Sequence, residues 1–585
     1  MRLEDYWGIG PKTRALLADE LGVEAAIEAV ESGDVRALTD AGIPRGRATR
    51  ILRHAHGGEA LDLLATRDAR NVYKQTLDII GEFAVTETAA DRIRILTPLP
   101  DEAAMQERLA DVEAGRETWA RLDEGDQSAV IEAFDAYDSV SGGERSAVQT
   151  ALRLREEGFT EGIFAPLADL DPETLSDATA ALAGLSGEGD RVGEGADSQL
   201  DALRSQLGGV EDMSATPGEV LEAVQSGARG TDELRDAFAR HVADESGVDV
   251  GRVREAMPSD AADASAFVGE TLRSLASGLR TAVEEREETV REELEGVLEA
   301  AADEVDAAVT AVDDIALALS LARFAAAFDL TRPAFVDREV TGVVAARNVF
   351  LEDAGEAVQP VTYAVGDHDL DVPGATVPPT GDRVAVLTGA NSGGKTTLLE
   401  TLCQVQLLAQ MGLPVPADAA EVSVVDTIVF HRRHASFNAG VLESTLRSVV
   451  PPVTAGGRTL MLVDEFEAIT EPGSAADLLH GLVTLTVERA ALGVFVTHLA
   501  DDLEPLPDEA RVDGIFAEGL TTDLELEVDY QPRFETVGRS TPEFIVSRLV
   551  ADARDHSERA GYETLAESVG ESAVQRTLAD ARWTE

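Results

Sequence analysis

The feature that most constrains the fold is a glycine-rich segment between an apolar strand and a helix. The segment Gly389-Ala-Asn-Ser-Gly-Gly-Lys-Thr396 fits the pattern G-x-x-x-x-G-K-[ST], after the apolar run 384–388 and before the helical pattern 398–410. In such a turn, glycines let backbone N–H groups converge on a phosphate at a helix N-terminus, where the helix dipole favours anions. Lys395 is then expected to reach the β- and γ-phosphates and Thr396 to bind Mg²⁺. The residues predicted to bind ATP are Gly389, Ala390, Asn391, Ser392, Gly393, Gly394, Lys395, Thr396 and Thr397.

Two later strand patterns end in polar side chains that suit the same chemistry. One apolar strand ends in Asp464-Glu465, about 70 residues after the glycine-rich segment, and another ends in Thr497-His498. We expect Asp464 to share the magnesium ion with Thr396, and Glu465 to polarise the attacking water. His498 is expected to sense the γ-phosphate, although an isolated histidine can be purely structural.

The pattern of the chain predicts several domains of different classes. The length of 585 residues exceeds one hydrophobic core. Strand candidates at 383–388, 427–430, 458–464 and 493–497 alternate with helices, which favours an α/β domain with a largely parallel sheet. A long helical stretch covers 265–328. We therefore predict a multidomain α + α/β fold, with helical turns at 1–56, a helical core with lever or clamp arms at 57–335, a P-loop ATPase domain at 336–545 and a helical extension at 546–585.

Composition excludes other classes of protein. No apolar run reaches the roughly 18 residues of a membrane span, and the N-terminus lacks the apolar core of a signal peptide, so we expect a cytoplasmic protein. The single Cys403 excludes an internal disulfide framework. The chain has 110 acidic and 49 basic residues, only three of which are lysines. This composition resembles that of proteins from salt-accumulating halophiles, in which molar salt shortens the Debye length to about 3 Å. The acidity therefore indicates a salt-rich habitat rather than the charge of a binding partner, and it carries little weight against binding of nucleic acid.

Two similar turns near the N-terminus predict a DNA-binding module. Gly8-Ile-Gly-Pro-Lys12 and, about 34 residues later, Gly42-Ile-Pro-Arg-Gly-Arg47 each precede a helix. Both resemble helix-hairpin-helix motifs, which bind the DNA backbone through main-chain N–H groups without reading bases. Residues 36–55 hold five arginines and one acid, whereas the chain as a whole is strongly acidic. The predicted DNA-binding residues are Gly8, Gly10, Lys12, Gly42, Arg45 and Arg47. A protein-docking module that does not bind DNA is the alternative.

A glycine-rich turn, a strand ending in Asp-Glu and a strand ending in Thr-His occur together in ATPases of the ABC type, in which two subunits sandwich ATP. The finer pattern resembles the MutS family. Residues 388–397 are similar to its T-G-P-N-x-G-G-K-[ST]-T, with Ala390 in place of proline, and residues 412–417 resemble its G-x-x-V-P-A. Residues 464–473 look closest to D-E-L-G-x-G-T-[DS]-P, especially in the second branch of the family, and residues 538–541 resemble the G-x-S end of the domain.

The resemblance implies a homodimer that binds ATP at a seam between two ATPase domains. It covers about 358–551 and extends weakly to 91–99. It also suggests that Ser436 contacts the γ-phosphate in trans, in place of the family's S-T-F-x-x-E segment, although an ordinary helix N-cap explains this serine equally well. Two glycines of the family are Glu467 and Ile469 here, so the loop that faces the partner subunit departs from the pattern. The resemblance does not imply recognition of mismatches.

The resulting expectation is an ATP- and Mg²⁺-dependent, DNA-binding ATPase in DNA repair or recombination. Its DNA binding is expected to be largely independent of sequence, with a preference for branched or distorted structures. Phe350 or Tyr363 is expected to stack on adenine, and the sequence does not choose between them. The alternatives are an ATPase acting on stalled ribosomes and a scaffold that binds ATP without hydrolysing it. An ABC transporter subunit would need an L-S-G-G-Q segment between the glycine-rich segment and Asp464, where none occurs.

Overall fold

The computed structural model divides the chain into two compact units. Unit 1 comprises Met1–Ile131 with Asp314–Glu585, and unit 2 comprises Glu132–Asp313. The residues that the structure describes are Leu3, 6–57, 60–139, 143–185, 191–225, 230–372, 376–389, 394–433, 439–466, 472–520, 526–538, 542–553, 555–570, 574–575 and 578. Among them, no helix is both long and apolar enough to cross a bilayer.

A six-stranded sheet forms the centre of the α/β part of unit 1. Its order is β10-β9-β4-β8-β7-β6, and all neighbours are parallel except β9 and β10. The strands are β4 (Val384–Gly389), β6 (Thr427–His431), β7 (Thr459–Asp464), β8 (Leu492–Val496), β9 (Ala510–Leu520) and β10 (Leu526–Arg533). The predicted α/β class and largely parallel sheet are confirmed.

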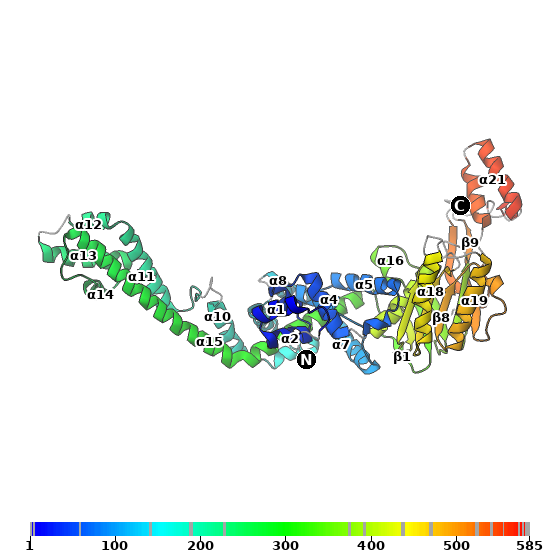
Figure 1. The fold of residues 1–585 in the computed structure, drawn as a ribbon, viewed down its shortest axis with the longest axis horizontal. Coiled ribbons are helices and arrows are strands. Elements are labelled where there is room, and N and C mark those ends of the chain that lie inside the picture. Colours follow the sequence, from blue (N-terminus) through cyan, green and yellow to red (C-terminus); the bar gives the residue numbers. More distant parts are fainter. Residues whose placement is uncertain are drawn as a thin grey trace. The chain divides into compact units, whose positions relative to one another are not determined.

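Helices cover both faces of this sheet, which explains its apolar strands. Alternate residues of β7 enter different cores: Leu460 and Leu462 face one cluster, whereas Met461 and Val463 face the other. The first cluster contains α17 (Lys395–Gln410) and α5 (Arg67–Glu82), and the second contains α18 (Ala439–Thr454) and α19 (Pro472–Glu488) (Figure 1). Strands buried on both faces need to be apolar throughout, as β7 is.

A second, four-stranded sheet packs against the first core and was not predicted. Its order is β1-β5-β2-β3, with β1 (Ala334–Phe335), β2 (Val340–Ala346), β3 (Val361–Gly366) and β5 (Ala419–Val422). Helix α17 lies beside β2 as well as β6 and β7, so polar residues on it are also buried. The buried Gln406 donates to Ser423 O at 2.8 Å and accepts from Thr341 at 3.0 Å, which ties α17 to this sheet. The short helix α16 (Val349–Asp353) follows β2, and η5 (Ala500–Leu503) follows β8.

The helices between residues 60 and 121 belong to the same unit as the sheets. They are η2 (Ala60–Leu63), α5, α6 (Glu87–Arg94) and α7 (Glu102–Arg121). Buried residues of α5 share a core with the sheet, and Thr66 donates from its hydroxyl to Phe430 O at 2.5 Å. The contacts therefore group 60–131 with the α/β part, whereas the sequence placed 57–335 in one region. The predicted domain boundaries remain predictions.

The first 57 residues form four short helices with a core of their own. These helices are α1 (Pro11–Glu20), α2 (Val23–Ser32), α3 (Val35–Asp40) and α4 (Arg45–Gly57). A glycine with positive φ opens each of the two predicted turns, Gly8 at +82° and Gly42 at +86°. A Cβ on Gly8 would lie 3.1 Å from Ile51 of α4, and one on Gly42 would lie 3.8 Å from Leu16 of α1. Each turn thus packs on the helix that follows the other turn.

Unit 2 is helical throughout its described residues. Its helices are α9 (Glu144–Glu156), η3 (Gly162–Ala168), α10 (Pro172–Leu185), α11 (Ser198–Ala215), α12 (Pro217–Gln225), α13 (Thr231–Ser246) and α14 (Val250–Glu255). Helices α8 (Glu124–Ser139) and α15 (Ala264–Ala327) contribute residues to both units. The predicted long helix at 265–328 is confirmed by α15. A core around Phe238, Phe267 and Leu272 holds α11 to α14 against the first half of α15.

Helices α20 (Pro542–Asp552) and α21 (His556–Val569) follow the sheet and pack on each other around Val546, Val550 and Ala566.

Candidate nucleotide-binding site

The carboxyl ends of three adjacent strands bring the predicted catalytic residues together. Strand β8 pairs with β4 on one side and β7 on the other, with Asp464 directly opposite Val496. The Glu465 N–H donates to Val496 O at 2.9 Å, which fixes the chain just beyond β7. Because parallel strands end at one edge of the sheet, residues far apart in the sequence meet there, as they do in open α/β folds that bind ligands at this edge.

Lys395 lies at the N-terminus of α17, against the end of β4. Its side chain is only 4% exposed, and its Nζ donates to Gly389 O at 2.8 Å. Gly389 has φ +127°, and a Cβ there would lie 2.1 Å from Ile515 O, so only glycine fits. Gly394, with φ +70°, precedes the helix. The ammonium group is thus buried at the N-terminus of a helix, where the helix dipole would stabilise an anion.

Thr396 and Asp464 form the candidate magnesium site. The Thr396 hydroxyl donates to Asp464 Oδ2 at 2.6 Å. Burial raises the pKa of Asp464, the hydrogen bond from Thr396 opposes this, and the neighbouring Glu465 adds to the increase. The described residues contain no group of three or more His, Cys, Asp or Glu side chains placed to hold a metal. A hydroxyl and one carboxylate fit Mg²⁺, which prefers oxygen ligands and keeps water or phosphate oxygens in its remaining positions.

Glu465 is held by two cationic or hydrogen-bonding side chains. His498 Nε2 lies 2.9 Å from Oε1, and Arg433 Nη1 lies 2.5 Å from Oε2. The hydrogen bond with His498 lowers the pKa of Glu465, and the charges of Arg433 and Lys395 lower it further. Glu465 also has a positive φ of +42°, a conformation that non-glycine residues adopt rarely and mostly at functional sites. The carboxylate is therefore kept ionised and aimed at the edge of the sheet.

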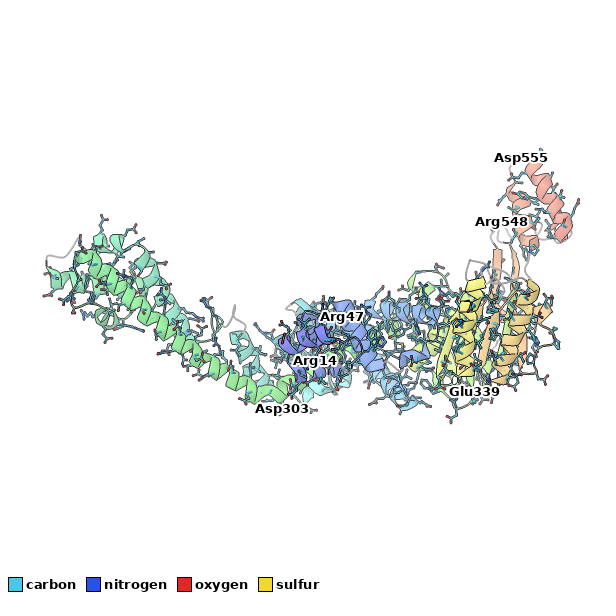
Figure 2. The ribbon with its side chains drawn as sticks, viewed as in Figure 1. Arg14, Arg47, Asp303, Glu339, Arg548 and Asp555 are labelled. Carbon is cyan, nitrogen blue, oxygen red and sulfur yellow. The ribbon has the colours of Figure 1, made fainter. Side chains whose placement is uncertain are left out.

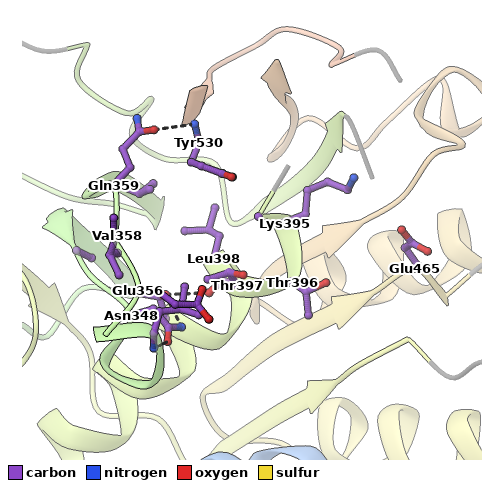
Figure 3. Close-up of a pocket in the computed structure, with 16 residues that line it drawn as sticks. Asn348, Glu356, Val358, Gln359, Lys395, Thr396, Thr397, Leu398, Glu465 and Tyr530 are labelled. Carbon is purple, nitrogen blue, oxygen red and sulfur yellow. Dashed lines mark hydrogen bonds between the residues drawn. The ribbon is translucent and has the colours of Figure 1, made fainter. Parts of the chain in front are cut away.

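A cavity of about 410 Å³ extends from these residues toward β10. Lys395, Thr396 and Glu465 line it together with Asn348, Gln359 and Tyr530, which Figure 3 shows. Gln359 Oε1 accepts from the Tyr530 N–H at 3.2 Å, and Gln359 Nε2 donates to Asp529 at 2.9 Å. Tyr530 is 39% exposed, and a Cβ on Gly394 would lie 2.7 Å from its ring. An aromatic side chain thus stands directly beside the glycine-rich turn.

The predicted aromatic partners of adenine are wrong on this geometry. Phe350 is buried in the core between the two sheets, and Tyr363 is fully buried and donates to Asp513 at 2.8 Å. Neither lines the cavity, whereas Tyr530 does. The sequence offered both as candidates without choosing between them, and their apolar neighbours draw both side chains into the core. Tyr530 was missed because its strand, β10, reaches the turn only through the tertiary fold.

Several predicted contacts lie outside the described residues. They are Ala390, Asn391, Ser392, Gly393 and Ser436. The loop departures at Glu467 and Ile469 lie outside them as well. Within the described part, Thr397 lines the cavity, and a Ser-Thr pair occurs at Ser444-Thr445 on α18. This pair matches the first two positions of the family's S-T-F segment, and the sequence reasoning overlooked it. Gly538 donates from its N–H to Thr388 Oγ1 at 2.6 Å, which places the start of the predicted G-x-S segment beside β4.

The predicted DNA-contact residues lie together on the N-terminal helices, but the two arginines make internal contacts. Arg45 forms a bidentate ion pair with Asp91, at 3.0 and 2.8 Å, which docks α4 on α6. Arg47 Nη2 donates to Gly8 O at 3.2 Å and to Thr13 Oγ1 at 2.6 Å. Lys12, in contrast, is exposed at the start of α1, two residues after Gly10. Arg45 and Arg47 thus stabilise the module as well as adding charge to it.

These features define an α/β domain with a candidate nucleotide site at the ends of β4, β7 and β8. Comparison with known proteins shows which family this domain resembles. Residues 385–504 match the family model of MutS domain V. The DNA-binding protein MutS2 of Pyrococcus furiosus is 44% identical over 227 residues, which are 39% of this chain and 39% of that protein. The DNA mismatch repair protein MutS of Granulibacter bethesdensis is 27% identical over 452 residues, 73% of this chain and 45% of that protein.

A third relative, the endonuclease MutS2 of Thermus thermophilus, is 32% identical over 177 residues, 29% of this chain and 23% of that protein. The matches therefore span less than half the length of each of these relatives. Residues 385–504, which include β5 to β8 and all but the first residue of β4, are thus similar to a MutS domain V. The resemblance to the MutS family and to its second branch, read from the motifs, is confirmed.

Proposed function

We propose that this chain is an ATP-dependent DNA-binding protein of the MutS type, which hydrolyses ATP as a homodimer. The observation that carries the proposal is the cluster of Lys395, Thr396, Asp464 and Glu465 at one edge of the sheet of a MutS domain V. Relatives named as DNA-binding and mismatch-repair proteins support a nucleic-acid role. A role in repair or recombination is part of the same proposal.

In this proposal the triphosphate occupies the glycine-rich turn at the N-terminus of α17. Lys395 would exchange its contact with Gly389 O for the β- and γ-phosphate oxygens, because a phosphate is a stronger partner than a carbonyl. Tyr530 would pack against the nucleotide beside the turn, since it lines the cavity next to Gly394 and remains 39% exposed. The resemblance to the MutS family implies further contacts from the backbone of residues 390–393 to the phosphates.

Thr396 and Asp464 would hold Mg²⁺, which supplies charge neutralisation at the phosphates when it is bound. The Thr396 hydroxyl and Asp464 Oδ2 already lie 2.6 Å apart. The two adjacent carboxylates differ in proton affinity, and a cation bound at Asp464 would favour its ionised form. Burial raises the pKa of Asp464, whereas His498 lowers that of Glu465. A strongly held Glu465 carboxylate can orient water while Asp464 serves the cation.

Hydrolysis would proceed by in-line attack of water on the γ-phosphorus. The water oxygen forms the new bond to phosphorus, the bond from phosphorus to the β–γ bridging oxygen breaks, and Glu465 accepts the proton of the water. His498 would position Glu465 through its 2.9 Å contact and lie near the γ-phosphate. Arg433 occupies Oε2 of Glu465, so this contact has to open before water can bind there.

Two further parts of the proposal concern the partner subunit and DNA. ATP would be sandwiched between two domains V, with Ser436 or the exposed Ser444 of α18 reaching the γ-phosphate in trans. DNA would bind the N-terminal module through the helix-hairpin-helix turns at Gly8–Lys12 and Gly42–Arg47. Unit 2 carries 42 acidic residues and 14 arginines, a formal charge of −28. Phosphates are therefore better accommodated on the N-terminal module than on unit 2.

DNA and RNA retention by the full chain tests the nucleic-acid part. We expect the protein to retain duplex and junction DNA more strongly than RNA of the same length, and Lys12→Glu to weaken DNA binding. Lys74→Glu is the matched control, because Lys74 is an exposed lysine of unit 1 on α5, away from the two turns. Tighter binding of RNA would favour the ribosome alternative, and equal DNA affinity of the two variants would remove the turns from the proposed interface.

A further inference from the structure

The N-terminal module presents an exposed aromatic pair that the backbone-binding turns do not explain. Trp7 stacks on His54 with ring centroids 3.9 Å apart and an angle of 25° between the planes. Trp7 is nevertheless 56% exposed, the most exposed of the large hydrophobic residues that the structure describes. A tryptophan that contributes to the core would bury most of its surface. Trp7 instead keeps more than half of it in solvent, immediately before Gly8.

Contacts along one side of α4 fix the position of Trp7. His54 stacks on its ring, and the side chain of Ile51 lies one turn away, 3.1 Å from where a Cβ on Gly8 would be. One further turn back, Arg47 Nη2 donates to Gly8 O at 3.2 Å. Positions 47, 51 and 54 follow the spacing of one helical face. The indole is therefore held beside the first turn, and little side-chain entropy remains to be lost when a ligand binds it.

Charge is segregated within the module, and Trp7 belongs to its basic part. The described residues 6–18 and 41–57 carry only basic charges, on Lys12, Arg14, Arg45, Arg47, Arg50 and Arg53, and the acids nearest to Trp7 in the sequence are Glu4 and Asp5. Residues 19–40 carry seven acids and Arg36. The helix α4 that contacts Trp7 thus has no acidic residue, and Figure 2 marks Arg14 and Arg47 on this module. An anionic polymer that approaches the basic part meets the exposed ring.

We propose that Trp7 and His54 form a platform on which the module stacks an unpaired nucleobase or an exposed terminal base pair. The inference rests on the proposed binding of DNA by this module and deepens it, since the turns would hold the backbone while the platform takes a base. Aromatic stacking tolerates any base sequence. It also persists at high ionic strength, where contacts to phosphate contribute little. Bases inside an intact duplex cannot reach the ring, so the platform selects branched, frayed or single-stranded DNA.

Affinity measurements on two matched DNAs test the platform. One DNA is a duplex closed by hairpins at both ends, and the other is the same duplex with a single-stranded flap; both are titrated by fluorescence anisotropy at fixed KCl. We expect the wild type to prefer the flap, and Trp7→Ala to lower flap affinity about tenfold but capped-duplex affinity less than twofold. Trp7→Phe should retain most of the preference. Val23→Ala is the control, because Val23 is 45% exposed on α2 in the acidic part.

An optical readout makes the test independent of the folding of Trp7→Ala. In a Trp119→Phe, Trp583→Phe background, tryptophan emission arises from Trp7 alone. We expect the flap DNA to quench this emission and the capped duplex to leave it unchanged. Equal wild-type affinities for the two DNAs, equal losses on both in Trp7→Ala, or unquenched emission would overturn the platform and leave the proposed DNA binding in place. If Trp7→Ala binds both DNAs as the wild type does, the exposed pair is a protein-docking site. A wild type that binds neither DNA would remove the proposed function as well.

Discussion

The chain contains two glycine turns that each lead to a lysine at the start of a helix, and they differ in what surrounds them. Lys395 is only 4% exposed, and a Cβ on Gly389 would collide with the backbone of Ile515 at 2.1 Å. Lys12 is exposed, and a Cβ on Gly8 would lie 3.1 Å from the side chain of Ile51 and not from backbone. A buried turn can surround one phosphate chain and support chemistry, whereas an exposed turn can only share contacts along a polymer. Changes at the turn before Lys395 should therefore have large effects, and changes at the turn before Lys12 should have small ones.

The largest effect is expected for Lys395→Ala. The substitution removes a buried cation whose field is strong at low dielectric, so ATP turnover should fall by roughly a hundredfold or more. Steady-state phosphate release and binding of a fluorescent ATP analogue measure this effect. Lys74→Ala, which removes an exposed lysine of the same unit, should leave both unchanged. A Lys395→Ala protein with near wild-type turnover would show that this turn does not hold the triphosphate.

Gly389→Ala should strongly destabilise unit 1. The added Cβ would lie 2.1 Å from Ile515 O, and φ at this position is +127°. Relieving the collision requires β4 and β9 to separate, at a cost of about 3 kcal/mol or more in the free energy of unfolding. Gly381→Ala measures the cost of the positive φ without a collision, because Gly381 has φ +96° but open space around its Cβ position. This substitution should cost about 1 kcal/mol in the free energy of unfolding. Urea unfolding at fixed KCl compares them, and similar losses would contradict the role of the collision.

The exposed turn should tolerate the equivalent change better. Gly8→Ala places a Cβ at a φ of +82° and 3.1 Å from Cγ1 of the buried Ile51, a side-chain contact that a small shift can relieve, so we expect a loss of about 1–2 kcal/mol in the stability of the N-terminal module. Gly10→Ala is the matched control, because Gly10 has a φ of −84° and nothing within 4 Å of its Cβ position. Hydrogen exchange of amides in α1 and α4 reports on the module itself. A larger loss for Gly10→Ala than for Gly8→Ala would refute the proposed geometry.

Lys12→Ala should weaken DNA binding by a few-fold and lower the slope of log affinity against log salt by about one. The physical reason is that an exposed lysine contributes one of many phosphate contacts and no chemistry. ATP turnover without DNA should not change. Filter binding over a series of KCl concentrations measures the slope, and an unchanged slope would show that Lys12 does not neutralise a phosphate in the complex.

The smallest effect is expected in unit 2, where the ion pair between Arg286 and Asp197 lies near the surface. The hydrogen bond from Arg286 lowers the pKa of Asp197 to about 2. Because this pKa lies below its unfolded value, the pair stabilises the fold above about pH 4, and that contribution is lost as the pH falls toward 2. Arg286→Ala should therefore be slightly less stable than wild type at pH 7 and equally stable near pH 2. Arg240→Ala, on exposed surface of α13, should show no such pH-dependent difference.

The buried turn was also the part of the molecule that the sequence predicted best. Strands β4, β6, β7 and β8 are apolar runs that end in distinctive residues, so both the strands and the contact between Thr396 and Asp464 followed from local patterns. Tyr530, the second sheet and the contact between Arg433 and Glu465 depend on how distant segments pack, which no local pattern records. The choice of Phe350 or Tyr363 failed for the same reason, since burial of a particular aromatic is decided by the tertiary fold.

For the N-terminal turns, the sequence predicted the positions of the turns but not the role of each basic residue. Their glycines and helices were found from a short repeat, and the structure adds the reciprocal packing of Gly8 on α4 and Gly42 on α1. The sequence offered Arg45 as a phosphate contact, yet its bidentate pair with Asp91 shows that a basic residue can hold the module in place instead. Charge alone does not distinguish these two uses.

The central claim, that ATP is bound by Lys395 and hydrolysed beside Asp464 and Glu465, is tested most directly by Glu465→Gln. The isosteric amide keeps the shape of the site but cannot accept a proton from water. Nucleotide bound and phosphate released should be measured on the same samples, in high KCl with Mg²⁺. We predict that the variant binds ATP as tightly as the wild type and turns it over at least a hundredfold more slowly. Equal turnover by wild type and Glu465→Gln would contradict the account, and background-level turnover by both would identify the protein as a scaffold that binds ATP without hydrolysing it.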